Sequence, residues 1–186
     1  MKRNRLQLLI LSSIFTAIIG ILAQITIPFP LVPITGQTLA IGLAATILGA
    51  RYGTISTLLY IAVGAIGVPI FASMQGGIGA IVGPTGGYLI GFIPTAYFIG
   101  WYIEKTKLTF THVMIANLIG MIITLAFGTI WLKISASLSW SVAISTGVLP
   151  FLIGGILKAA LTSYIGVLVK KRLYSARLLP KEMINS

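Results

Sequence analysis

Lys158 is the residue whose position says most about chemistry. It lies in the apolar segment 147–169, which is long enough to span a bilayer and holds no acidic residue. The whole chain has two acidic side chains, Glu104 and Glu182, and both lie beside basic clusters at segment ends. An ammonium group at membrane depth costs about 2.5 kcal/mol or more unless an anion pairs with it. Because no internal acid is placed to do so, we infer that the counter-charge is the anionic group of a ligand.

The depth of Lys158 follows from its distance to Lys170, which we take as the inner boundary of the segment. Twelve residues separate the two lysines. At about 1.5 Å per residue, Lys158 lies about 18 Å from that boundary, near the membrane midplane. A lysine side chain snorkels over only about 6 Å, less than the distance to either interface. The alternative is a lysine that reaches a thin or watery region and has no role.

The composition is that of a membrane protein. Of the 186 residues, 57% are hydrophobic and 8% are charged, whereas soluble domains carry about three times that share of charge. The net charge is +11, but the basic residues cluster at the ends of apolar segments, which indicates membrane orientation and not nucleic-acid binding. The absence of cysteine excludes disulfides and thiolate metal sites.

Six apolar segments are predicted to be membrane-spanning helices, because a backbone inside a bilayer must satisfy its own hydrogen bonds. The segments are residues 6–27, 37–50, 53–70, 86–103, 111–132 and 148–169. A proline-containing connection follows the first segment, a glycine-rich linker covers residues 71–85, and a serine-rich loop covers residues 133–146. We therefore expect an all-α membrane protein in which residues 1–186 form one six-helix domain.

The basic residues predict the orientation of these helices. With a cytoplasmic N-terminus, the inner segments hold eleven of the thirteen lysine and arginine residues, and the outer loops hold only Lys133. Positive residues are enriched on the cytoplasmic side, so both termini are expected there. The eleven inner residues are Lys2, Arg3, Arg5, Arg51, Lys105, Lys107, Lys170, Lys171, Arg172, Arg177 and Lys181.

The glycine-rich segment 76–92 is the second region that could bind a ligand. It contains seven glycines in seventeen residues, which is unfavourable within a helix but allows close approach of the backbone. Pro84 and Thr85 suit a helix start, whose free N–H groups attract anions or polar ligand oxygens. Gly87 and Gly91 form a G-x-x-x-G face for tight helix packing. The alternative is a segment used for packing only.

Aromatic and amide side chains in the outer half are further candidates. Tyr88 and Trp131 could line an apolar slot that opens outward, or they could be interfacial aromatic residues. Gln37 offers a donor and an acceptor to an amide- or urea-like group, or it caps a helix. Asn117 lies only about 10 Å from the inner boundary, so we expect it to bond to a neighbouring helix and not to a ligand.

The sequence lacks the groups of an enzyme or an energy-coupled carrier. It has no metal-ligand cluster, no paired carboxylates and no phosphate-binding loop, so we expect neither catalysis nor a cofactor. It also has no intramembrane acid and no inverted repeat, so energy for transport must come from a partner. Ser13 and Ala17 form a small-x-x-x-small pattern on which a partner helix could dock, or which packs within the chain.

The chain resembles the BioY family, the biotin-specific substrate-binding subunits (S components) of energy-coupling factor (ECF) transporters of bacteria and archaea. The resemblance covers essentially the whole length. It is carried by residues 33–38 (PITGQT), 64–69 (GAIGVP), 76–92 (GGIGAIVGPTGGYLIGF) and 150–158 (PFLIGGILK). It implies an ECF S-component-like fold of six helices in a prokaryotic cell membrane, with an outward-facing pocket that captures biotin.

The resemblance also implies roles for individual residues. In the family, the lysine at the position of Lys158 meets the valerate carboxylate, and the ring is held by the loop before the fourth helix and by the fourth to sixth helices. The expected substrate-binding residues are Lys158, Tyr88, Gln37, Gly79, Thr85, Gly86, Trp131 and Phe151. Gly155 stands where many family members have aspartate, so no role of that aspartate transfers to this chain.

Partners are implied as well. A transmembrane coupling protein and two ATPase subunits, all separate chains, drive transport in this family. Ser13 and Ala17 match in part the family's Ala-x-x-x-Ala motif for contact with the coupling protein. Two other functions stay open on the residues alone. One is a self-sufficient facilitator or carrier for a small carboxylic acid such as biotin or lipoate, and the other is a membrane enzyme acting on lipid substrates.

Overall fold

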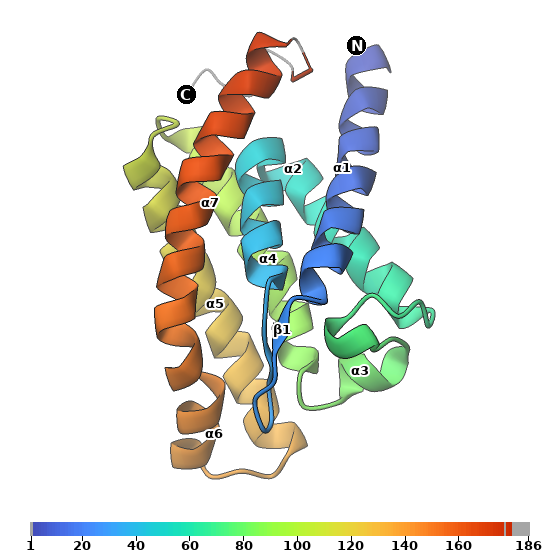
Figure 1. The fold of residues 1–186 in the computed structure, drawn as a ribbon, viewed down its shortest axis with the longest axis vertical. Helices are drawn as coiled ribbons and strands as arrows, with labels where there is room; N and C mark the ends of the chain where they lie inside the picture. Colours follow the sequence, from blue (N-terminus) through green and yellow to red (C-terminus); the bar gives the residue numbers. More distant parts are fainter. Residues whose placement is uncertain (1, 177, 180–186) are drawn as a thin grey trace.

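The computed structural model describes residues 2–176 and 178–179. Its elements are α1 (Lys2–Ala23), β1 (Thr26–Ile27), β2 (Ile34–Thr35), α2 (Gln37–Ala65), a 3-10 helix (Ala72–Met74), α3 (Ile78–Val82), α4 (Gly86–Lys105), α5 (Phe110–Ser135), α6 (Trp140–Gly147) and α7 (Leu149–Ser175) (Figure 1). The prediction of an all-α protein is confirmed. Arg177, Lys181 and Glu182, used above for charge and orientation, lie outside the described residues.

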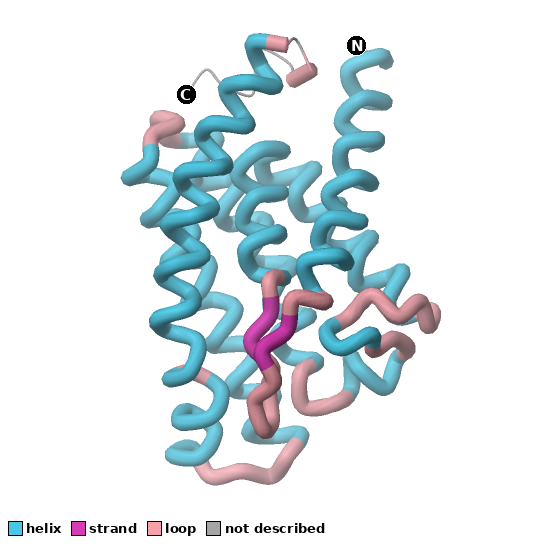
Figure 2. The backbone as a smooth tube through the Cα atoms, viewed as in Figure 1, coloured by secondary structure: helices cyan, strands magenta, loops and turns pink. Residues whose placement is uncertain are grey.

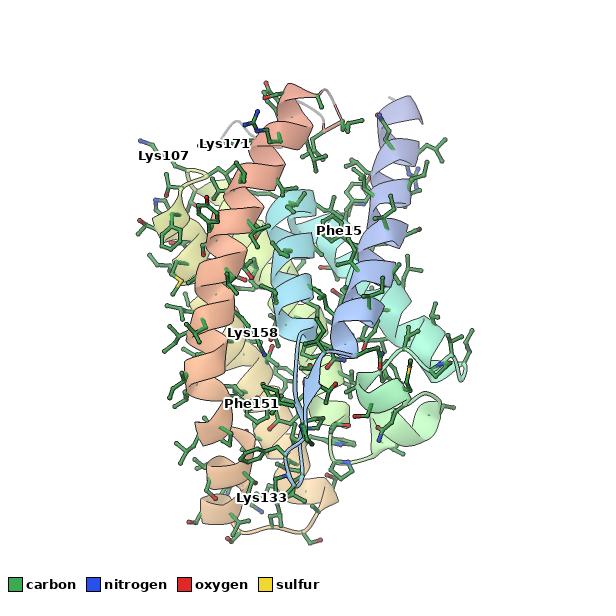
Figure 3. The ribbon with its side chains drawn as sticks, viewed as in Figure 1. Phe15, Lys107, Lys133, Phe151, Lys158 and Lys171 are labelled. Atoms are coloured by element: carbon green, nitrogen blue, oxygen red, sulfur yellow. The ribbon has the colours of Figure 1, made fainter. Side chains whose placement is uncertain are left out.

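Four helical segments of the described chain are long and apolar enough to cross a membrane: Arg5–Ala23, Gln37–Ala65, Phe110–Ser135 and Trp140–Ser175. The six spans and the cytoplasmic termini therefore stay predictions. The arrangement is the one they require, because α1 begins and α7 ends at the same end of the bundle (Figure 1). Lys107 and Lys171 lie at that end, Lys133 lies at the other, and Lys158 lies between (Figure 3).

α2 is broken at Gly49, whose φ of 76° and ψ of −176° are accessible essentially to glycine alone. A Cβ on Gly53 would lie 2.6 Å from Cα of Ala45, although eight residues of straight helix span about 12 Å. The second arm of α2 therefore folds back along the first. The first arm corresponds to the predicted span 37–50 and the second to the predicted span 53–70, but the second arm ends earlier than predicted, at Ala65.

Two charged side chains bond to backbone groups on either side of the break. Glu104 Oε1 accepts a hydrogen bond of 2.8 Å from the backbone N–H of Ala50, at the start of the second arm. Lys170 Nζ donates to the carbonyl of Thr46 at 3.0 Å, at the end of the first arm. Helix ends leave such backbone groups unpaired, and these charges match the helix dipoles. Lys170 is only 1% exposed, so it is a buried structural residue as well as a marker of the inner boundary.

Two segments predicted as connections are partly helical. The linker 71–85 contains the 3-10 helix and α3, and the loop 133–146 contains α6. α6 forms because the Ser139 side chain accepts a hydrogen bond from the backbone N–H of Val142 at 3.4 Å, which caps its first turn. The connection after α1 is an antiparallel hairpin in which Thr26 pairs with Thr35, and it lies across one face of the bundle (Figure 2).

α4 packs between α2 and α5, and α7 packs against α2 and α5. The predicted G-x-x-x-G face is confirmed as a packing surface. A Cβ on Gly87 would lie 2.7 Å from the carbonyl oxygen of Phe127, and one on Gly91 would lie 2.9 Å from Phe127 Cβ. These glycines bring α4 and α5 close together and so fix one side of the space in which a ligand can bind.

Candidate functional site

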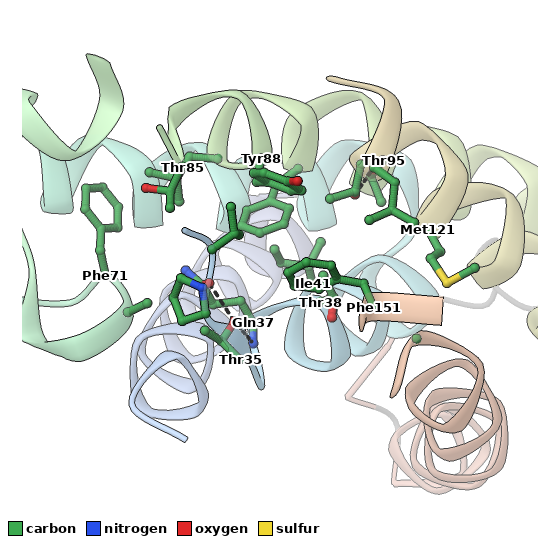
Figure 4. A pocket seen from close by; sticks show the side chains of 18 of the residues that line it. Thr35, Gln37, Thr38, Ile41, Phe71, Thr85, Tyr88, Thr95, Met121 and Phe151 are labelled. Atoms are coloured by element: carbon green, nitrogen blue, oxygen red, sulfur yellow. Dashed lines mark hydrogen bonds between the residues drawn. The ribbon is translucent and has the colours of Figure 1, made fainter. Parts of the chain in front are cut away.

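A cavity of about 540 Å³ lies between the hairpin, the segment that precedes α4, and helices α2, α4, α5 and α7. Its volume is in the usual range of ligand-binding sites, about 300–1,000 Å³. Thr35, Gln37 and Thr38 face Thr85 and Tyr88 from across this space (Figure 4). The cavity therefore joins the segments that the sequence analysis singled out separately.

Lys158 lines this cavity from α7. Its Nζ donates to the carbonyl oxygen of Thr35 at 2.6 Å and to Thr38 Oγ1 at 3.3 Å. An ammonium group has three N–H donors, and both of these partners are uncharged. Glu104, the sole acidic residue of the described chain, bonds to Ala50 instead. Within the described residues, Lys158 therefore has no carboxylate partner, and its charge is available to an anion in the cavity.

Gln37 connects the hairpin to the loop that follows α2. Its Oε1 accepts a hydrogen bond from Thr35 Oγ1 at 2.7 Å, and its Nε2 donates to the Tyr60 hydroxyl at 2.6 Å. Tyr60 in turn donates to the carbonyl oxygen of Ile70 at 3.1 Å. Gln37 lines the cavity, and both the carbonyl oxygen and the NH₂ group of its amide have a partner within the protein. The network holds Thr35 in place, and with it one of the two acceptors of Lys158.

Tyr88 and Phe151 form an aromatic wall, with ring centroids 6.0 Å apart and planes inclined by 32°. Both residues line the cavity. The Tyr88 hydroxyl donates to the carbonyl oxygen of Gly147 at 2.8 Å, so the ring and not the hydroxyl is presented to a ligand. The wall provides the apolar surface that the sequence analysis expected near Tyr88.

The glycine-rich segment contributes to the cavity in part. Gly79 and Thr85 line it, whereas Gly86 and Trp131 are not among its lining residues. A Cβ on Gly86 would overlap the backbone of Ile81, so this glycine is needed for packing. Trp131 donates through Nε1 to the carbonyl oxygen of Gly83 at 2.9 Å, so it positions the loop that faces the ligand space.

Polar side chains that the sequence analysis did not assign to the site also line the cavity. Thr95 donates to the carbonyl oxygen of Gly120 at 3.1 Å and lies 2.8 Å from Thr124 Oγ1. Asn117 lines the cavity too, although we expected it to bond to a neighbouring helix. Its amide instead donates to its own helix, at Val113. The depth of Asn117 along the membrane normal could not predict that it lines the cavity, because depth does not show where neighbouring helices leave space.

Ser13 and Ala17 lie on an exposed face of α1. On the other side of this helix, Ser12 and Thr16 donate to the carbonyl oxygens of Tyr52 and Ser56 at 3.2 and 3.0 Å. The small-residue pattern is therefore not used for packing within the described part of the chain. It remains available to a second protein.

The fold and the cavity define the class as a helical membrane protein with an internal binding site for an anionic small molecule. The chain belongs to the BioY family, whose family model matches residues 1–175. It is 38% identical over 167 residues to the biotin transporter BioY2 of Lactococcus lactis subsp. cremoris, and this match covers 90% of this chain and 92% of that relative. It is also 39% identical over 163 residues to the biotin transporter BioY of Thermotoga maritima, and this match covers 88% of this chain and 95% of that relative.

A solved structure of an S-component for biotin has a similar fold. The chain is similar to the S-component for biotin from an ECF-type ABC transporter, with a TM-score of 0.85 and 31% sequence identity. The match covers 92% of this chain and 94% of that one. The ECF S-component-like fold implied by the sequence resemblance is confirmed.

Proposed function

We propose that this chain is the biotin-binding membrane subunit of an ECF-type vitamin uptake system in a prokaryotic cell membrane, and that it is not an enzyme. The proposal includes one six-span domain over residues 1–186, with both termini in the cytoplasm and a pocket that takes biotin from outside with high affinity. Membership of the BioY family and the similarity to biotin transporters support it. The observation that carries it is the charge of Lys158, which lines the cavity without a carboxylate partner among the described residues.

The chemistry of biotin fits this cavity. Biotin has a carboxylate, an apolar chain and a ureido ring that both donates and accepts hydrogen bonds. Lys158 supplies a cation for the carboxylate, and Tyr88 and Phe151 supply an apolar wall for the chain and the ring. Burying the ion pair between the ammonium and the carboxylate removes the cost of an unpaired charge at membrane depth, about 2.5 kcal/mol or more.

Energy for transport comes from other chains in this proposal. A transmembrane coupling protein contacts α1 at Ser13 and Ala17, and two ATPase subunits drive release of biotin to the inside. The exposure of both small residues supports this contact, because small side chains let a partner helix approach closely. Replacing Ala17 by leucine should lower uptake by the complete complex and leave biotin binding by the isolated chain unchanged. Equal uptake would refute the contact.

The test of binding is a titration of the purified chain with biotin by isothermal calorimetry. Lys158→Ala is expected to lower the affinity at least about tenfold, because hydrogen bonds to charged groups are worth about 1.5–3 kcal/mol. Lys171→Ala is the matched control, since Lys171 is an exposed lysine of the same helix. Proteoliposomes containing this chain alone should bind biotin without accumulating it. Accumulation by the chain alone would favour the self-sufficient carrier.

A further inference from the structure

The cavity is closed at one end by four residues from four helices, Ile41, Ile99, Asn117 and Thr162, which we call the cavity floor. Each is the lining residue of its helix closest to the end of the bundle where α1 begins and α7 ends (Figure 1). Two of the four are polar. A polar floor beneath an aromatic wall must be matched by polar groups of the ligand, because unpaired buried polar groups are costly.

Asn117 contributes a buried amide to the lining of the cavity. Its side chain is only 7% exposed, and Nδ2 donates to the carbonyl oxygen of Val113 at 2.9 Å. A carbonyl oxygen can only accept, so this bond fixes the NH₂ group toward the helix and leaves Oδ1 on the other side. Among the hydrogen bonds of the described residues, the Asn117 side chain takes part only in this one, so none involves Oδ1.

Thr162 adds a hydroxyl at the same place. It is 1% exposed, and none of the hydrogen bonds found among the described residues involves its Oγ1. A Cβ on Gly42 would overlap Asn117 Oδ1 and would lie 3.3 Å from Thr162 Oγ1. The missing side chain of Gly42 therefore leaves room for Asn117 Oδ1, with Thr162 Oγ1 close to the same point. An acceptor beside a hydroxyl complements the N–H and C=O of a urea or amide group.

The cavity floor lies at a distance from the ammonium group of Lys158. Lys158 Nζ bonds to Thr38, whereas the floor atoms surround Gly42, four residues farther along the same arm of α2. Four residues correspond to about 6 Å of helix. A ligand that binds at both places must carry an anionic group and an N–H group at least that far apart.

Other polar groups of the cavity are less suited to this role. The Gln37 carbonyl oxygen already accepts from Thr35, and the NH₂ group already donates one of its two N–H groups to Tyr60. Thr95 donates its hydroxyl proton to Gly120 and accepts from Thr124, so this threonine pair has no free donor. The floor offers an acceptor and a donor on buried side chains, whereas Ser73, Gln75 and Thr85, which also line the cavity, are more exposed.

We propose that Asn117 and Thr162 recognise the ureido group of biotin, with Asn117 Oδ1 accepting from a ureido N–H and the Thr162 hydroxyl donating to the ureido carbonyl. This inference rests on the proposed function, since it takes biotin as the ligand. It makes the two residues determinants of specificity: Lys158 selects any small carboxylate of suitable length, and the floor distinguishes biotin from acids without a urea or amide group.

The test compares biotin with two analogues, each methylated at one ureido nitrogen, by calorimetric titration of the purified chain. Wild type should lose at least about tenfold in affinity for one of them, because a buried acceptor would lose its donor. Asn117→Leu should bind biotin at least about tenfold more weakly, and methylation should cause no further loss. Thr162→Val should weaken biotin binding in the same direction.

Thr57→Val is the matched control for folding. It removes a side-chain bond to the backbone four residues earlier, at Gly53, just as Asn117→Leu does at Val113. Thr57 is buried and does not line the cavity. Gly42→Ala is a second test: it keeps both floor side chains but displaces Asn117 Oδ1 from its place beside α2, so it should also weaken binding.

Wild-type affinity for biotin in Asn117→Leu or in Gly42→Ala would overturn the inference, as would an unchanged penalty for methylation in Asn117→Leu. None of these results would affect the proposed function, which the same titration tests separately through the binding of biotin by the wild-type chain. The two failures are therefore distinguishable in a single set of experiments.

Discussion

Tyr60 is predicted to hold the binding site together from outside the cavity. It is fully buried, accepts a hydrogen bond from Gln37 at 2.6 Å and donates to Ile70 at 3.1 Å. Tyr60→Phe keeps the shape of the ring and leaves the Gln37 amide N–H without this partner. An unpaired buried donor costs about 1–3 kcal/mol. The Ile70 carbonyl keeps a second donor, Gln24 Nε2 at 3.3 Å, so its loss adds little.

For a chain of this length, each kcal/mol lowers the unfolding midpoint by about 2–4 °C, so the midpoint should fall by about 2–12 °C. The assay is thermal unfolding in detergent, followed by tryptophan fluorescence. Tyr97→Phe is the matched control, because Tyr97 is 56% exposed, and it should leave the midpoint unchanged. Biotin affinity should also fall in Tyr60→Phe, because the network positions Thr35, which accepts from Lys158.

A double variant separates the hydrogen bond from the bulk of the side chains. Gln37→Leu combined with Tyr60→Phe removes both partners, so the combined destabilisation should be smaller than the sum of the single effects. Strict additivity, or a Tyr60→Phe protein as stable as wild type, would refute the view that this network connects the hairpin to the loop after α2.

Two further predictions concern the helices that shape the cavity. Gly91→Ala would place a Cβ 2.9 Å from Phe127 Cβ. The unfolding midpoint should therefore fall, in line with the usual overpacking cost of about 1–3 kcal/mol. Gly154→Ala is the control, because there is open space around Gly154, and it should be neutral or stabilising. Glu104→Ala removes the acceptor of the Ala50 N–H at the break in α2. It should lower the same midpoint, because a lost N-cap costs about 0.5–2 kcal/mol of stability. An unchanged midpoint in Gly91→Ala or in Glu104→Ala would contradict the corresponding contact.

Much of the fold could be predicted from the sequence. Apolar segments predicted the long helices, and the G-x-x-x-G pattern of Gly87 and Gly91 predicted the contact that α4 makes with α5. Lys158 could be singled out because its charge conflicts with its surroundings in the sequence. A conflict of that kind is visible without coordinates, since it depends on composition along one helix and not on which helices are neighbours.

Features that depend on neighbouring helices could not be predicted. The break in α2 requires Gly49 to adopt a positive φ, and glycines of similar context in other helices do not. Lys170 appeared to be one more basic residue at a segment end, and its burial depends on the unpaired carbonyl of Thr46. Asn117 lines the cavity, and its Oδ1 fits there beside Gly42, on another helix, because that residue has no side chain.

Trp131 illustrates the same limit in the candidate site. Its sequence position suggested an aromatic surface for a ligand, whereas its indole N–H bonds to the carbonyl of Gly83. The aromatic wall is formed by Tyr88 with Phe151, which comes from α7. Residue type and depth thus indicated that aromatic rings would be near the ligand, but which ring faces it depends on helix rotation.

The most direct measurement of the central claim is the affinity of the purified chain for biotin and for its uncharged amide, in wild type and in Lys158→Met. If the Lys158 ammonium pairs with the ligand carboxylate, wild type should prefer biotin by about tenfold or more, in line with the value of hydrogen bonds to charged groups. Lys158→Met should bind the two ligands about equally. A preference for biotin that persists undiminished in Lys158→Met would contradict the account.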